Sequence, residues 1–106
     1  MKIKDIKNME DFEEVTQGNK KWMLLKHSLT CPISGSANQA YESFSEQSEM
    51  PLYRLYVQDS RELSNYIAKK YKVQHESPQV IKFENDKPSW HTSHFDITVD
   101  NLIRHI

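Results

Sequence analysis

The stretch WMLLKHSLTCPISGSANQAYESF, residues 22–44, contains the strongest structural signal in this chain of 106 residues. It opens with four successive apolar residues, which is typical of a strand buried on both faces of a parallel sheet. After Cys31-Pro32, apolar residues recur at helical spacing, at Ile33, Ala37, Ala40, Tyr41 and Phe44. The stretch therefore predicts a strand, a short turn that carries the only cysteine of the chain, and an amphipathic helix beginning at Pro32.

Two further strand–helix units flank this stretch. The N-terminal MKIKDI predicts a short edge strand. The next helix is expected over MEDFEEVTQ, residues 9–17, with Asn8 as its N-cap and Gly18 as the stop that follows its last residue. LYRLYV predicts a second strand, because its residue types are strongly β-prone. Asp59, with Glu62 in the capping-box position, predicts the start of the helix that follows.

The C-terminal part predicts a hairpin and a last helix. VIKF is a short strand, ENDK (residues 84–87) is a turn cluster, and SWHTSHF (residues 89–95) is the returning strand. Thr98 is the expected cap of the last helix. The order is β-α-β-α-β-α-β-β-α, which predicts an α/β fold with a mixed sheet and helices on both faces. We expect residues 1–106 to form one domain.

Composition narrows the function classes. The chain has 14 basic and 15 acidic residues and a formal net charge of -1, and it shows no basic stripe, so we expect no nucleic-acid partner. No apolar run reaches the roughly 18 residues of a membrane helix, and the N-terminus has no apolar signal region. A single cysteine cannot form an internal disulfide, which fits a reducing compartment. We therefore expect a cytoplasmic protein without a membrane partner.

Cys31 allows two interpretations. Most free cysteines are small buried hydrophobes, but a cysteine between a strand and Pro32 at a helix start is placed for reactivity. Free N–H groups and the helix dipole at that position stabilise a thiolate, the nucleophilic form of cysteine. The position favours the reactive interpretation. No metal site is expected, because His91 and His94 are three residues apart and would lie on opposite faces of a strand.

Ser34 and Ser77-Pro78 complete the candidate site. Ser34 stands where a dithiol redox protein has its second cysteine, and it is either a hydrogen-bond partner of the sulfur or an ordinary first-turn serine. Pro78 is either an ordinary edge-strand proline or a counterpart of the cis-proline of thioredoxin-like folds. In those folds the residue before the proline, here Ser77, presents its backbone to an extended thiol substrate.

TCPIS within HSLTCPISGSANQAYESF, followed by LYRLYVQD, ESPQVIKF and WHTSHFDIT, resembles the monothiol bacilliredoxins of the bacillithiol system, in the thioredoxin-like superfamily. The likeness covers nearly the whole chain and implies a thioredoxin-like fold and a thiol–disulfide oxidoreductase. The substrate it implies is a protein joined by a mixed disulfide to bacillithiol, a cysteinyl glucosaminyl malate thiol. Cys31 would attack that disulfide, keep the bacillithiol and release the target protein.

The resemblance also suggests partners and supporting residues. Because Ser34 replaces a second cysteine, bacillithiol or another redoxin would regenerate Cys31; bacillithiol is a co-substrate, and no bound cofactor is expected. Thr30 and Pro32 flank the cysteine. His94, on the returning strand, and His27, four residues before the cysteine, are candidates for holding the thiolate or, for His94, the malate carboxylates. Both histidines also fit an ordinary packing or surface role.

A second function class stays open at this point. The same fold can act as a redox-sensing or binding module, modified at Cys31 by bacillithiol or a partner without turnover. The absence of a second cysteine in the chain fits both classes, since either protein depends on an external thiol.

Overall fold

A computed structural model describes residues 3–106, and the strands and helices within this range follow the predicted order. Their bounds are β1 Ile3–Asp5, α1 Met9–Gly18, β2 Lys21–His27, α2 Pro32–Ser45, β3 Leu52–Tyr56, α3 Arg61–Tyr71, β4 Gln79–Glu84, β5 Lys87–Ser93, a 3₁₀ turn η1 His94–Asp96, and α4 Val99–Arg104. The first two residues of the predicted edge strand lie outside the described residues.

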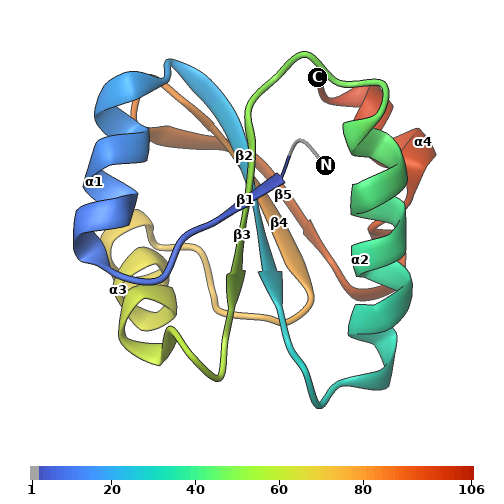
Figure 1. The fold of residues 1–106 in the computed structure, drawn as a ribbon, viewed down its shortest axis with the longest axis horizontal. Helices are drawn as coiled ribbons and strands as arrows, with labels where there is room; N and C mark the ends of the chain where they lie inside the picture. Colours follow the sequence, from blue (N-terminus) through green and yellow to red (C-terminus); the bar gives the residue numbers. More distant parts are fainter. Residues whose placement is uncertain (1–2) are drawn as a thin grey trace.

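The strands form one mixed sheet in the order β1-β3-β2-β4-β5. β1, β3 and β2 are parallel, whereas β4 runs antiparallel to β2 and β5 antiparallel to β4. The carboxyl ends of the three parallel strands therefore lie at one edge of the sheet, and α1, α2 and α3 all begin there (Figure 1). In open α/β sheets this edge is the usual place for a ligand site.

Helices cover both faces of the sheet, as predicted. α1 and α3 lie on one face, and α2 and α4 lie on the other (Figure 1). Side chains of β2 alternate between the two layers: Trp22 and Leu24 join the core under α1 and α3, while Met23 and Leu25 join the core under α2 and α4. All four are fully buried, so the apolar run of β2 reflects burial on both faces.

The helix starts were predicted with mixed success. Asn8 caps α1 by accepting a hydrogen bond from the N–H of Asp11 at 2.9 Å, and Thr98 caps α4 in the same way. The prediction for α3 was wrong, because that helix begins at Arg61 with Ser60 as its N-cap. The N–H groups of Asp59 and Ser60 both bond to the carbonyl of Tyr56, so residues 57–60 form the turn that leaves β3.

Two other boundaries differ from prediction by one or two residues. Gly18 is the last residue of α1, and Asn19 caps the helix, its side-chain amide donating to the carbonyl of Val15 at 3.0 Å. The returning strand β5 ends at Ser93 and not at residue 95. His94 leaves the sheet because its backbone is left-handed, with φ of 55°, and its N–H bonds to the carbonyl of Pro78.

None of the helices within residues 3–106 has the length and apolarity needed to cross a membrane.

Candidate functional site

Cys31 lies at the carboxyl edge of the sheet, in the turn that joins β2 to α2. It is the N-cap residue of α2, and Pro32 occupies the first helical position. The cysteine is partly exposed, and its side chain makes no capping hydrogen bond to the helix. The strand, cysteine, proline and helix thus follow one another as the sequence predicts.

Ser34 is fully buried one turn into α2. Its Oγ accepts a hydrogen bond from the backbone N–H of Ser28 at 3.3 Å, and its own N–H bonds to the carbonyl of Cys31 at 3.0 Å. The hydrogen bond to the sulfur that one interpretation offered is not formed in this structure. The Ser34 hydroxyl instead fastens the preceding turn to the helix.

Gln58 holds the loop before the cysteine and was missed by the sequence analysis. Its Oε1 accepts from the N–H of Leu29 at 3.0 Å, and its Nε2 donates to the hydroxyls of Ser28 and Thr30 at 2.9 and 3.2 Å. Thr30 is thereby brought into a polar cluster beside Cys31. The available signal was position: Gln58 follows β3 closely, and β3 ends at the same edge as its parallel neighbour β2.

The Ser77–Pro78 peptide bond is cis, as the resemblance to thioredoxin-like folds implies. Pro78 is buried and directly precedes Gln79, which pairs with Lys26 of β2. Because β4 is antiparallel to β2, its first residue lies at the edge where β2 ends. The cis-proline and Cys31 therefore come to the same edge of the sheet from segments 47 positions apart in the sequence.

The two candidate histidines occupy different surroundings. The backbone N–H of His94 donates to the carbonyl of Pro78 at 3.0 Å, so the fold brings His94 to the cis-proline. His27 is buried at the end of β2, with its ring packed edge-on against Tyr56 at 5.3 Å between centroids. Burial and, secondly, the positive charge of Arg54 lower the pKa of His27, so its ring is neutral at pH 7.

A buried cation lies behind the site. Lys26 of β2 is fully buried, and its Nζ donates to the carbonyl of Ser64 in α3 at 3.0 Å and lies 3.4 Å from Nδ1 of His75. The Ser64 hydroxyl lies 3.2 Å from the same nitrogen. Burial lowers the pKa of Lys26 to about 8 and also, with the nearby Lys26 charge, lowers that of His75. Since His75 is three residues before Pro78, these bonds join β2, α3 and the proline loop.

A mixed sheet of this order, with a partly exposed cysteine capping α2 and a cis-proline at the same edge, defines a thioredoxin-fold protein of the thiol–disulfide oxidoreductase type. One solved structure with a thioredoxin fold, suggested to be an oxidoreductase, is 42% identical, with a TM-score of 0.90 over 96% of this chain and 91% of that one.

Two thioredoxins share the fold at lower identity. A mutant thioredoxin from Halobacterium salinarum is 16% identical, with a TM-score of 0.81 over 98% of this chain and 87% of its own. Reduced thioredoxin from Schistosoma mansoni is 16% identical, with a TM-score of 0.78 over 98% and 94%. At the family level, residues 4–102 match the model of the monothiol bacilliredoxin BrxC, and the chain belongs to that family.

Proposed function

We propose that this protein removes bacillithiol from mixed disulfides with protein thiols, using Cys31 as the nucleophile. The observation that carries the proposal is the placement of the single cysteine: partly exposed, at the N-cap of α2, on the edge that also holds the cis-proline. Membership of the monothiol bacilliredoxin family supports bacillithiol as the thiol involved.

The proposed reaction has two exchange steps and needs no bound cofactor. The Cys31 thiolate attacks the bacillithiol sulfur of the mixed disulfide; a new disulfide forms, and the target thiolate leaves and takes a proton from water. A second thiol, from bacillithiol or a partner redoxin, then attacks the Cys31 disulfide and leaves with the bacillithiol, and Cys31 returns to the thiol form. Each step forms one S–S bond and breaks one.

We assign the residues around Cys31 to holding the cysteine and the substrate in position. Cys31 occupies the N-cap of α2, and Pro32 takes the helical position where no N–H is required. We assign the backbone of Ser77, which precedes the cis-proline, to binding the extended substrate. His94, whose N–H bonds to Pro78, is assigned to the edge of the same binding site. Ser34 and Thr30 hold the turn through Ser28. His27 supports the turn from the buried side by packing on Tyr56.

The test is to mix reduced protein with a bacillithiolated target and weigh both products by intact mass spectrometry. We expect the bacillithiol mass to move from the target to this protein, and Cys31→Ser to abolish the transfer. Ser36→Ala, an exposed serine on the same helix, is the matched control and should leave the transfer unchanged.

A second arm of the experiment, in which the protein is also given bacillithiol disulfide, separates the redox-sensing alternative. A sensor without turnover would take up bacillithiol at Cys31 from that disulfide, while the modified target kept its own bacillithiol. Transfer that persists in Cys31→Ser would contradict both functions. The single cysteine does not separate the two functions, because in either case the chain has no second thiol to release bacillithiol from Cys31.

A further inference from the structure

A cavity lies beside the cysteine loop, between the first turns of α1 and α3. It has a volume of about 300 Å³ and is lined by residues 7–9 and 58–63. Both helices begin at the carboxyl edge because each follows a parallel strand (Figure 1). Two helix N-termini therefore direct unpaired N–H groups and partial positive charge to this region.

The first turn of α3 is left without a cap. Ser60, the N-cap residue and part of the cavity wall, makes no side-chain cap bond. It is 3% exposed, and its hydroxyl has no hydrogen-bond partner within residues 3–106. The first helical bond runs from Ser64 N–H to the Ser60 carbonyl, so the three preceding N–H groups, of residues 61–63, have no partner inside the helix. At α1, by contrast, Asn8 caps the turn.

The charges around the cavity are of both signs. Lys7 and Arg61 supply two cations to its wall, and Asp59 and Glu62 supply two carboxylates. The cations and helix N–H groups suit carboxylate oxygens, which they bind through charge-assisted hydrogen bonds. The carboxylates suit hydroxyl donors. A ligand that carries both carboxylates and hydroxyl groups matches this wall better than a simple anion does.

Gln58 connects the cavity to the cysteine. Gln58 forms part of the cavity wall. Its side-chain amide accepts a hydrogen bond from the N–H of Leu29 and donates one to the hydroxyl of Thr30, the residue before Cys31. The cavity and the reactive sulfur are thus neighbours across one side chain. A ligand tethered through sulfur to Cys31 has this cavity beside it.

We propose that the cavity between α1 and α3 binds the malyl-glucosaminyl end of bacillithiol, with the malate carboxylates at Ser60, Arg61 and Lys7 and the sugar hydroxyls toward Asp59 and Glu62. This inference rests on the proposed function, because it assigns the substrate's polar end to a place beside Cys31. It adds to that function a binding site formed by α1 and α3, on the opposite face of the sheet from α2.

The binding test uses malyl-glucosaminide, which is bacillithiol without its cysteinyl group, and follows the amide signals of residues 61–63 by NMR. We expect saturable shifts at these amides. Ser60→Asp places a carboxylate at the N-cap, which satisfies the free N–H groups and repels the ligand, so affinity should fall about tenfold. Ser43→Asp, an exposed position on α2, adds the same charge elsewhere and should leave affinity unchanged.

Three results of this titration would overturn the proposal: no shift at the amides, equal affinity in Ser60→Asp, or equally strong binding of inorganic phosphate or free malate. The last result would make the cavity a general anion site. A kinetic comparison adds an independent readout. Ser60→Asp should slow transfer from a bacillithiolated target about tenfold, yet leave alkylation of Cys31 unchanged, and also transfer from the same target carrying 2-mercaptoethanol, a thiol without carboxylates. Equal slowing with both targets would show that the substitution acts through the loop instead.

The two proposals fail separately. If wild-type protein never takes bacillithiol from a target, the proposed function is wrong, whatever the cavity binds. If transfer occurs but the amide signals do not respond to malyl-glucosaminide, the cavity assignment is wrong and the reaction at Cys31 stands.

Discussion

At the scale of single residues, the buried ammonium of Lys26 makes the stability of this protein depend on pH. Burial lowers the pKa of Lys26 from 10.5 to about 8. Between these values the unfolded chain holds a proton that the folded chain has lost, so the free energy of unfolding rises with pH. Below pH 8 the folded protein keeps the ammonium buried, which costs on the order of 3 kcal/mol.

Lys26→Met should therefore flatten the dependence of stability on pH between about 8 and 9.5. Met has a similar length and carries no charge, so the difference in unfolding free energy between variant and wild type should shrink as pH rises. Urea unfolding at a series of pH values measures it. Lys69→Met, an exposed lysine in α3, is the control.

An unchanged slope in Lys26→Met would show that another group causes the rise. Tyr41 and Tyr71 are not that group, because burial raises their pKa values. A raised tyrosine pKa makes the unfolded state lose its proton first, and stability then falls at high pH.

Some residues of the site could be predicted from the sequence, and others could not. Cys31 and Pro78 were identifiable because each has a local pattern: a cysteine before a helix-starting proline, and a proline before a strand. Lys26 and Gln58 were not, since their roles come from contacts with segments 38 and 28 to 30 positions away. Such partners are set by the packing of the whole chain. The visible signals were a lysine inside an apolar strand and a glutamine just after the neighbouring strand.

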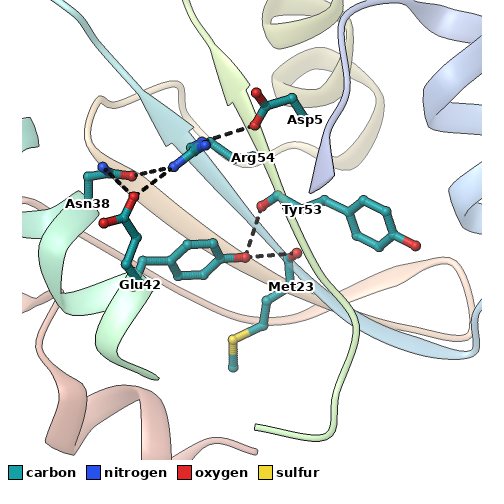
Figure 2. Close-up of polar contacts among 7 residues, drawn as sticks. Asp5, Met23, Asn38, Glu42, Tyr53 and Arg54 are labelled. Carbon is teal, nitrogen blue, oxygen red and sulfur yellow. Dashed lines mark hydrogen bonds and ion pairs between the residues drawn. The ribbon is translucent and has the colours of Figure 1, made fainter. Parts of the chain in front are cut away.

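At the scale of elements, Arg54 of β3 joins the edge strand β1 to α2. Its side chain is 8% exposed, and Figure 2 shows it between Asp5 on one side and Asn38 and Glu42 on the other. Arg54 Nε donates to Asp5 at 3.0 Å, and one terminal nitrogen donates to Asn38 at 3.0 Å and Glu42 at 3.3 Å. Within residues 3–106, β1 comprises three residues and pairs only with β3, so the side-chain bonds of Arg54 add to its attachment.

α2 has a second anchor on the same face. Tyr41 is fully buried, and its hydroxyl lies 3.0 Å from the carbonyl oxygen of Met23 in β2 and 2.9 Å from that of Tyr53 in β3. The helix that presents Cys31 is therefore fixed to the two strands whose ends form the site.

Arg54→Leu should lower the free energy of unfolding by about 1–3 kcal/mol, because it removes several charge-assisted hydrogen bonds at once. The loss stays in this range because the carboxylates of Asp5 and Glu42 are 39% and 35% exposed and can be hydrated after the change. Urea unfolding measures the loss. Arg104→Leu, at an exposed position in α4, should change stability by less than about 0.5 kcal/mol. Equal effects of the two substitutions would contradict the anchoring role.

The element boundaries illustrate why some predictions from sequence succeed. β2 was predictable because it is buried on both faces and therefore has a continuous apolar run. α2 was predictable because the residues that it buries recur at helical spacing. The start of α3 was not, since Asp59 and Ser60 are both good capping residues and the turn bonds to Tyr56 decide between them. The end of β5 depends on the bond from His94 to Pro78, which no local pattern shows.

At the scale of the whole molecule, the sheet separates two cores. One lies under α1 and α3 and includes Ile67; the other lies under α2 and α4 and includes Leu102. Both residues are fully buried, and a five-stranded sheet stands between them. Substitutions on opposite sides should therefore affect stability independently.

Ile67→Val should cost about 0.5–1.5 kcal/mol and Leu102→Ala about 2–5 kcal/mol. In the double variant we expect the two losses to add within about 0.5 kcal/mol. Urea unfolding of the single and double variants measures the coupling. Leu63→Ala combined with Ile67→Val, one turn apart in α3, is the comparison within one core and should deviate from additivity. Strong coupling between Ile67 and Leu102 would mean that the sheet transmits repacking from one core to the other.

The turn between β4 and β5 has a practical consequence. Asn85 and Asp86 form it with left-handed backbones, and it lies at the opposite end of β4 from Pro78. Both residues are exposed, so a dye, an affinity tag or a surface linker attached there would point away from Cys31. Protein immobilised through this turn would present its thiol to solution, which makes the hairpin a suitable attachment point for a sensor based on Cys31.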